Sequence, residues 1–289
     1  MERAWIELLR CPRTGSAYDL DPTREEGDDV VEAFLVSRRE QEVRPILSGM
    51  AVLVPDLRAH LREHGNVYAR IPLADSRIAR FVLGRIGRGT DDFVPFAEVV
   101  AHYGDLVEPG ELDPPPPMHA RDEALARLLV EHGVAQGRGV HVGCGVGRGA
   151  FVLRSLLDRA LGLDRSAARV RRARNVAVTR AAFFLPAPAG HPRKELPLEL
   201  DRMDRTHVDF AVASAEALPL ADAVADVVVL EGADGRGPLA DPARALAEAE
   251  RVLAPGGLLV VDGALGGTDG AGIGAGEGGE ALYRARRLT

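Results

Sequence analysis

The sequence lacks the features that mark several common classes of protein. It has no apolar run of about 18 residues, so no membrane-spanning helix is predicted, and the start "MERAWIELLR" lacks the cationic and then apolar order of a secretory signal. The two cysteines, Cys11 and Cys144, lie far apart in unlike contexts. A disulfide framework is therefore not expected, and cysteine alone cannot supply the four ligands of a structural zinc site. We expect a cytoplasmic protein without a bound metal.

Acidic residues outnumber basic ones, and aromatic side chains are scarce. The formal net charge is -7, and aromatic residues make up 4% of the chain. A chain with this balance has no overall positive field to attract nucleic acid or anionic lipid, and few rings on which bases could stack. Arginines do gather in "RSAARVRRARNVAVTR". We interpret them as a solvated helix face, with a phosphate contact as the alternative, so nucleic acid is a disfavoured partner and a membrane is not expected.

Composition and periodicity divide the chain into three regions. Residues 1–58 predict a small α+β domain, with a short amphipathic opening, an acidic turn-like stretch "TREEGDD" and short strands near "GMAVLVPD". Residues 59–118 show helical periodicity and end in "DPPPPM", which is a stiff spacer because each proline restricts its own backbone and that of the residue before it. Residues 119–289 form the third predicted domain.

The third region alternates helices with strands. Strands are predicted at residues 139–142, 160–163, 209–213, 226–230 and 258–261, with helices over 121–133, from 147, over 166–178 and from 241. This order predicts an α/β fold with a mostly parallel sheet covered on both faces. The insertion at 181–207 is longer than most connections in such folds, and its role is open.

The C-terminal tail is rich in glycine. Nine of the seventeen residues from 263 to 279 are glycine, too costly in conformational entropy for a regular element. We therefore expect the sheet to lack its usual last strands. Either "ALYRARRL" supplies one abbreviated strand, or a homodimer or partner protein covers the sheet edge.

The stretch "VHVGCGVGRGAF" holds the strongest local motif. Gly143, Gly145 and Gly147 follow a predicted strand, where the absence of Cβ atoms lets backbone N–H groups approach a ligand. Asp164 ends the next strand, where a carboxylate can accept hydrogen bonds from ribose hydroxyls. These features fit a nucleotide-like ligand, including a dinucleotide, because Gly145, Gly147 and Ala150 satisfy the relaxed dinucleotide fingerprint. The alternatives are a tight turn without a ligand and a solvated Asp164.

Two later stretches make the assignment more specific. "ASAEALPLADAVADVVVLEG" and "DPARALAEAERVLAPGGLLVVDG" follow the acidic strand end. Over residues 139–262 the chain resembles class I S-adenosylmethionine-dependent methyltransferases in its glycine motif, acidic end of strand two, "AEALP" loop and "RVLAPGG" turn. Dinucleotide enzymes carry only the first two features. The resemblance implies a Rossmann-like sheet with helices on both faces, S-adenosylmethionine as the cofactor and methyl transfer as the activity.

The resemblance also assigns cofactor-binding residues. It places Gly143, Cys144, Gly145 and Gly147 along the methionine and ribose, Asp164 at the ribose hydroxyls, and Arg165 beside the adenine. It places Ser214, Ala215 and Glu216 at the adenine edge, and Leu230 with Glu231 near the sulfonium. His141 stands where the family usually has an acid, and Ser214 where it often has Asp. Near a cationic ligand His141 would have to stay neutral, and a histidine packed beneath the turn is the alternative.

The first region carries a second resemblance. "LLRCPRTG" and "VRPILSGMAVLVPD" resemble the small zinc-ribbon partner protein that activates several tRNA and translation-factor methyltransferases. Cys11 is retained, but Thr14, Ser37 and Glu40 stand where the other three cysteines would fall. The resemblance implies this fold without its metal. Such a domain would pack on the methyltransferase part and shield a strand edge or shape substrate access.

These patterns predict an active methyltransferase whose acceptor is not readable from the sequence. A small molecule or biosynthetic intermediate is slightly favoured over RNA or protein. No catalytic residue is assigned, and His102, His207 and Glu231 are the candidates for a general base. Tyr103 is either a lid residue or part of the core. The alternative function is a catalytically silent, methyltransferase-like binding or scaffold subunit that activates a partner, indicated by His141, Ser214, the missing zinc ligands and the short C-terminal end.

Overall fold

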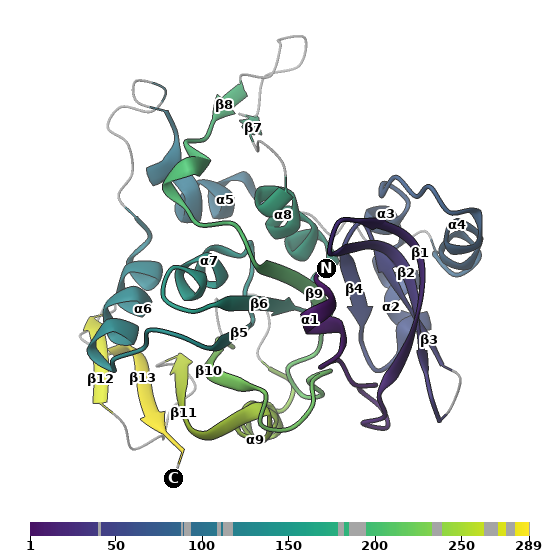
Figure 1. Ribbon diagram of the computed structural model, residues 1–289. Helices are drawn as coiled ribbons and strands as arrows, with labels where there is room; N and C mark the ends of the chain where they lie inside the picture. Colours follow the sequence, from purple (N-terminus) through teal and green to yellow (C-terminus); the bar gives the residue numbers. More distant parts are fainter. Residues whose placement is uncertain are drawn as a thin grey trace.

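The strands of the protein form one large mixed sheet and a small hairpin (Figure 1). The computed structural model describes residues 1–39, 42–87, 89, 94–108, 111, 118–178, 182–184, 195–232, 239–262, 271–275 and 281–288. The large sheet has eleven strands in the order β1-β2-β3-β4-β9-β6-β5-β10-β11-β13-β12, and the hairpin pairs β7 (Ala182–Phe184) with β8 (Glu195–Pro197). Within these ranges, no helix combines the length and apolar character needed to cross a membrane.

Five parallel strands form the centre of the sheet. In spatial order they are β9 (Val208–Ala213), β6 (Arg159–Asp164), β5 (Arg138–Val142), β10 (Ala225–Leu230) and β11 (Leu253–Asp262). The predicted strand positions are confirmed, with shifts at the ends of individual strands. Along β9, Phe210 and Val212 enter one core and Ala211 and Ala213 the other. A strand buried on both faces reads as a continuous apolar run, which is why the sequence indicated a parallel sheet.

Helices cover both faces of this sheet. One core contains residues of α6 (Ala120–Glu131), α7 (Arg148–Arg154) and α8 (Ala167–Val178), and the other contains residues of α1 (Arg3–Ile6) and α9 (Pro242–Val252). Asp241 caps α9 by accepting from the Arg244 N–H at 3.0 Å, and Pro242 occupies the first turn, where no hydrogen-bonded N–H is needed. The predicted α/β class and two-faced cover are confirmed.

At the C-terminal edge, the alternative in which "ALYRARRL" supplies a strand is confirmed, and a second strand that was not predicted corrects the expectation that the sheet lacks its usual last strands. β13 (Ala281–Arg287) pairs antiparallel with β11, and β12 (Ala271–Ala275) pairs antiparallel with β13. Tyr283 and Ala285, two positions apart on β13, are both buried. The glycine-rich tail forms a strand because an edge position is held by backbone hydrogen bonds on one side, which need no particular side chains. The last two strands therefore come from the chain itself.

The N-terminal region continues the same sheet. β1 (Tyr18–Glu26), β2 (Asp29–Ser37), β3 (Val43–Leu47) and β4 (Met50–Leu53) pair antiparallel in sequence order, and β4 then pairs parallel with β9. The first unit thus shields the edge of β9, as the sequence led us to expect. The acidic "TREEGDD" was interpreted as a turn, but it lies mostly in β1, and the hairpin turns at residues 27–28. The proposed domain boundary at residue 58 stays a prediction.

Thr14 and Ser37, at two of the positions where the zinc-ribbon protein has cysteines, carry hydroxyl groups that are linked through Ser16. The Ser16 Oγ lies 2.8 Å from the Ser37 Oγ and 3.0 Å from the Thr14 Oγ1. Cys11 is buried, with its Sγ 3.9 Å from a Glu42 carboxylate oxygen. Glu40 lies outside the described residues. The likeness of this unit to a zinc ribbon stays a prediction.

Short helices connect the N-terminal strands β1–β4 to the part of the chain that forms the parallel strands. They are α2 (Leu57–Glu63), α3 (Gly65–Tyr68), α4 (Ser76–Leu83), α5 (Phe96–Tyr103) and the 3-10 helix η1 (Gly104–Leu106). In the insertion, a second 3-10 helix, η2 (Leu200–Arg202), follows β8, and Leu198 bridges to Val107 just after η1. The prolines at 114–117 and most of the insertion between β7 and β8 lie outside the described residues.

Two arginines of α8, Arg169 and Arg174, make internal contacts, which corrects their interpretation as part of a solvated face. Arg174 is buried, with one guanidinium nitrogen 3.3 Å from Asp209 on β9 and another 3.3 Å from Asp29 on β2. Arg169 forms a two-pronged ion pair with Glu98 of α5 at 2.8 and 3.3 Å. Arg180 lies outside the described residues. The described contacts of Arg169 and Arg174 therefore tie α8 to its neighbours and favour no phosphate role.

Candidate active site

The glycine turn lies at the point where the sheet reverses its strand order. Gly143 follows β5 and Glu231 follows the neighbouring β10, and the Glu231 N–H donates to the Val142 carbonyl at 2.9 Å. Chain connections leave in opposite directions from these two strands, which opens a crevice at their carboxyl ends. Gly143 has φ +80°, and a Cβ there would lie 2.1 Å from the Glu231 carbonyl oxygen. The turn requires glycine for both reasons.

Asp164 ties the glycine turn to the end of β6. One carboxylate oxygen accepts from the Gly145 N–H at 2.9 Å, and the other accepts from the Ser166 N–H at 2.7 Å. Ser166 immediately precedes α8, so the carboxylate also stabilises the start of that helix. Asp164 therefore faces the turn from the neighbouring strand, as the sequence predicted.

Two cavities meet at this crevice. The first has a volume of about 320 Å³ and is lined by the ends of β6, β9 and β10, together with Glu63 and His64 from the end of α2. The second has a volume of about 480 Å³ and lies between the glycine turn, α5 and the start of α6. Gly143 and Glu231 line both cavities. The two cavities are therefore adjacent at these two residues.

Ten of the twelve predicted cofactor residues line a cavity. The first cavity is bordered by Gly143, Asp164, Arg165, Ser214, Ala215, Glu216 and Glu231. The second is bordered by His141, Gly143, Cys144, Gly145 and Glu231. Gly147 and Leu230 line neither. A Cβ at Gly147 would lie 2.6 Å from that of Ala173 and 2.8 Å from the Phe210 ring, so this glycine allows close packing of the turn on α8 and β9, and Leu230 lies in the core.

His141 lies beneath the turn and faces an acid from the next strand. Its Nε2 lies 3.5 Å from a Glu231 carboxylate oxygen, and its ring packs so closely on Gly149 that a Cβ there would lie 2.4 Å from it. The Tyr283 hydroxyl of β13 donates to the same Glu231 carboxylate. Burial by itself raises the pKa of Glu231, but His141, Tyr283 and Arg121 outweigh burial and lower that pKa to about 2. Glu231 is therefore ionised at neutral pH.

The ionised Glu231 predicts a specific acid sensitivity. Because its folded-state pKa lies below the ordinary 4.5, its stabilising contribution is present above about pH 4.5 and is lost as the pH falls toward 2. The difference in free energy of unfolding between the protein and Glu231→Gln should shrink as the pH is lowered from about 6 to about 3.5. Urea denaturation at both pH values measures it. An equal difference at both pH values would contradict the lowered pKa of Glu231.

Near the first cavity, Ser214 and Glu216 form a hydrogen-bonded pair. The Ser214 hydroxyl donates to a Glu216 carboxylate oxygen, and the other Glu216 oxygen accepts from the Ala240 N–H at 3.0 Å. A carboxylate is thus present two residues beyond the position where the family often has Asp. Cys144 is buried, and burial raises the pKa of its thiol well above the ordinary value, so it is not a nucleophile at neutral pH.

The structure separates the three candidate bases. His102 lines the second cavity, where its Nδ1 lies 2.9 Å from Asp122. Burial lowers the pKa of His102, but the hydrogen bond and charge of Asp122 outweigh burial and raise it. His207 precedes the amino end of β9 and forms a hydrogen bond with Glu2. It therefore lies at the opposite end of the parallel strands from the glycine turn. Glu231, with its pKa near 2, is a weak base.

Several cavity residues were not predicted. In the second cavity they include Glu98, His119, Arg121 and Asp122. The spacing of His119 and Asp122, one helical turn apart at the start of a predicted helix, is the signal that could have identified them. Tyr103 is fully buried and donates to the Val146 carbonyl at 2.7 Å, so it belongs to the core and braces the turn.

A family model matches the part of the chain that contains the glycine turn. Residues 140–261 match the family model described as "Methyltransferase domain". No curated protein matches the chain. Similar solved structures include the YcgJ protein from Bacillus subtilis, with 19% identity, a TM-score of 0.36, and coverage of 48% of this chain and 50% of that one.

Two further solved structures are a protein from Methanococcus maripaludis, proposed to be an S-adenosylmethionine-dependent methyltransferase, and a protein from Pyrococcus horikoshii. The first has 18% identity, a TM-score of 0.36, and coverage of 50% of this chain and 58% of that one. The second has 22% identity, a TM-score of 0.39, and coverage of 58% and 66%. The chain thus spans half to two thirds of these structures. The family match, the strand order and the glycine turn together indicate a methyltransferase domain that uses S-adenosylmethionine over residues 140–261.

Proposed function

We propose that the protein transfers the methyl group of S-adenosylmethionine to an acceptor bound in the second cavity. The observation that carries this proposal is the meeting of the two cavities at Gly143 and Glu231. A cofactor with its adenosine in the first cavity and its methionine across the glycine turn would direct its methyl group toward the second. The cofactor and the acceptor would thereby be held in separate, adjoining spaces.

The first cavity offers matched partners for adenosine. Asp164 would accept from the two ribose hydroxyls, as a carboxylate at the end of the second strand can do in such sites. Arg165 and the Ser214–Glu216 pair border the same space, where they would flank the adenine.

Glu231 would replace the acid that the family usually has at position 141. The register places Val229 opposite His141, so Glu231 lies across from Gly143, where the methionine ammonium would pass. An ionised carboxylate there offsets the positive charge of the ammonium and sulfonium, while His141 fills the space under the turn. An acid after β10 in place of one on β5 would keep the negative charge beside the ligand and change only the strand that supplies it.

An exchange of the two residues tests this role. Glu231→Gln should weaken S-adenosylmethionine binding about 10- to 100-fold, because a charge-assisted contact is lost. Combining it with His141→Glu should recover most of the affinity, measured by isothermal titration calorimetry. The control is Glu250→Gln on α9, which borders neither cavity and should leave binding unchanged. Equal affinity in Glu231→Gln and the unaltered protein would refute the replacement.

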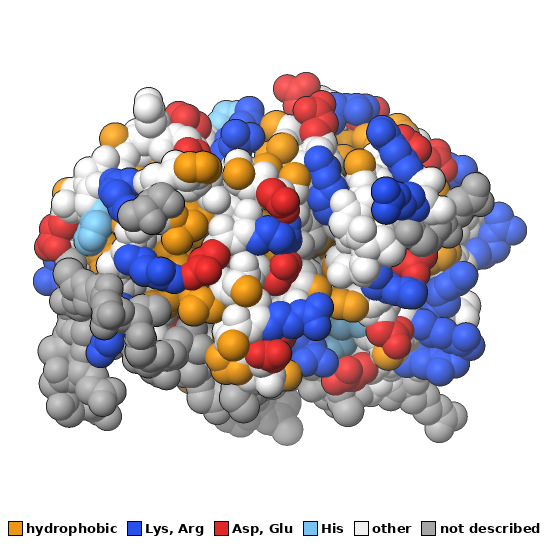
Figure 2. Space-filling model, turned by 90° about the horizontal axis from the view of Figure 1, so that it is seen from below, with side chains coloured by type: hydrophobic (Ala, Val, Ile, Leu, Met, Phe, Trp, Pro, Cys, Tyr) orange, Lys and Arg blue, Asp and Glu red, His pale blue; other side chains and the backbone are white. Residues whose placement is uncertain are grey.

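In the reaction, an acceptor atom attacks the methyl carbon as the carbon–sulfur bond breaks, leaving S-adenosylhomocysteine. The protein would contribute mainly alignment and exclusion of water. The second cavity, at about 480 Å³, has the size of a small-molecule site. Acidic and basic side chains are interspersed on the face drawn in Figure 2, and the net charge is -7. These features favour a small-molecule acceptor over RNA or protein.

The scaffold alternative gains no support from a specific observation. It rested partly on a shortened C-terminal end and on altered residues at 141 and 214. β12 and β13 complete the sheet, and Glu231 and Glu216 supply carboxylates beside both altered positions.

Calorimetric titration with S-adenosylmethionine and S-adenosylhomocysteine tests the proposed function directly. Saturable binding of both at one site per chain is the expected result. Absence of binding at millimolar concentrations of either ligand would leave the scaffold reading in its place.

A further inference from the structure

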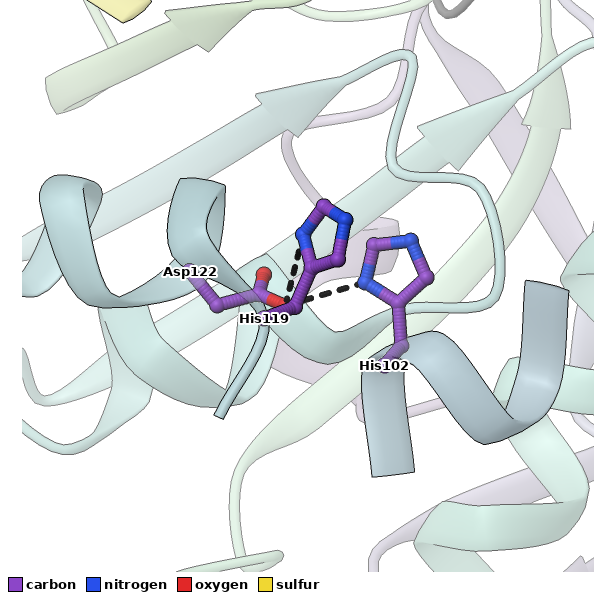
Figure 3. A group of neighbouring side chains, drawn as sticks. All are labelled: His102, His119 and Asp122. Carbon is purple, nitrogen blue, oxygen red and sulfur yellow. Dashed lines mark hydrogen bonds and ion pairs between the residues drawn. The ribbon is translucent and has the colours of Figure 1, made fainter. Parts of the chain in front are cut away.

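Three potential metal ligands converge in the second cavity. His102 lies in the last turn of α5, His119 immediately precedes α6, and Asp122 lies in the first turn of α6 (Figure 3). The Asp122 Oδ2 is 2.9 Å from the His102 Nδ1 and 3.8 Å from the His119 Nδ1. One potential ligand atom from each residue lies within 4.8 Å of the other two. Two imidazoles and one carboxylate thus point at a common centre.

The spacing of these atoms suits a divalent transition metal. Ligands that each bond a tetrahedral Zn²⁺ at about 2.0–2.1 Å lie roughly 3.3 Å apart. The two observed distances, 2.9 and 3.8 Å, fall on either side of this value. Imidazole with carboxylate is a donor set favoured by Zn²⁺ and by the neighbouring divalent ions of the first transition row.

His119 supplies a second and independent observation. Its Nδ1 is buried and has no hydrogen-bond partner among the described residues. A buried ring nitrogen without a partner is costly, and a metal bond would satisfy it. The Asp122 side chain is only 6% exposed, whereas those of His102 and His119 are 27% and 32% exposed. An ion could therefore reach the group from the cavity.

The surroundings leave open coordination positions toward the cavity. Three protein ligands leave at least one position of a tetrahedral ion free, as in catalytic zinc sites. The three residues line the same cavity as Gly145 and Glu231, next to the proposed path of the cofactor. An acceptor oxygen bound to the ion would consequently lie beside the glycine turn.

We propose that His102, His119 and Asp122 bind one divalent transition-metal ion, with Zn²⁺ as the first choice, which holds an oxygen atom of the acceptor. The ion-binding part stands on the three side chains alone, and the role toward the acceptor rests on the proposed function. The sequence predicted no metal because only cysteine ligands were considered there. The ligands come instead from two helices separated by the proline-rich spacer.

Direct metal binding tests the proposal. The full chain, without an affinity tag and freed of metal with a chelator, should bind one Zn²⁺ per chain in a calorimetric titration. Co²⁺ should give the visible absorption of a low-symmetry site. His119→Ala and Asp122→Asn should each weaken binding at least about 100-fold, since each removes a ligand. The control His132→Ala, at the other end of α6, should retain it.

The outcomes separate this proposal from the proposed function. The metal site would be refuted if the protein showed no saturable Zn²⁺ binding up to about 0.1 mM, or if both ligand variants bound as well as the unaltered protein. The three side chains would then be explained by the His102–Asp122 hydrogen bond alone. S-adenosylmethionine binding, measured on the same metal-free samples, reports on the function independently. Thermal unfolding of each variant in the chelator shows whether it is folded, and His119→Gln provides a second variant of similar size.

Discussion

Replacing Asp164 with alanine should weaken S-adenosylmethionine binding by about 100- to 10,000-fold. Two hydrogen bonds from ribose hydroxyls to a carboxylate contribute about 1.5–3 kcal/mol each, and about 1.4 kcal/mol corresponds to a factor of ten. Asp164 also accepts from the Gly145 N–H at 2.9 Å, so its loss would loosen the turn that faces the cofactor. Isothermal titration calorimetry with S-adenosylmethionine measures the effect.

A matched aspartate at the opposite end of the same strand provides the control. Asp158 precedes β6 and accepts from the Gly137 N–H at 2.9 Å, just as Asp164 ends β6 and accepts from the Gly145 N–H. Asp158→Ala should leave the affinity unchanged. Asp164→Asn, which retains one acceptor oxygen, should fall between the unaltered protein and Asp164→Ala. Affinity within about threefold of the unaltered protein in Asp164→Ala would remove the main support for the adenosine site.

Replacing Asp209 with alanine should lower the free energy of unfolding by about 3–5 kcal/mol, because removing one partner leaves the other charge buried. Asp209 on β9 is 1% exposed and lies 3.3 Å from the buried Arg174 of α8. Its second oxygen accepts from the Glu2 N–H at 2.8 Å, so the carboxylate joins the N-terminal unit to the parallel sheet. Urea denaturation at neutral pH measures the loss.

Asp29 offers a comparison at the same arginine. It lies 3.3 Å from Arg174, but its side chain is 36% exposed, so Asp29→Ala should cost no more than about 1 kcal/mol. Similar losses in the two variants would show that burial of Asp209 adds nothing to its pairing. Burial is also the largest influence on Asp209 itself, and it raises the pKa of that carboxyl group.

The order of strands and helices in residues 138–262 could be predicted from the sequence alone. Each central strand is buried on both faces, so it requires a continuous apolar run, and those runs are visible in the chain. The glycine turn was visible for a similar reason, since Gly143 and Gly147 have positive φ angles that other residues adopt only with strain. Local requirements of this kind can be recognised in short stretches of the sequence.

The joins between distant segments were decided only by the tertiary structure. β12 forms from a glycine-rich tail because backbone pairing with β13 needs no side-chain pattern, and β4 joins β9 in the same way. His141 meets Glu231 because β5 and β10 are in register, and His102 meets His119 and Asp122 because α5 packs near the start of α6. The sequence by itself determined the strands and helices of residues 138–262 and the position of the glycine turn. Which charges face one another across that turn depends on the register and packing of segments far apart in the chain, and short-range patterns carry no information about either.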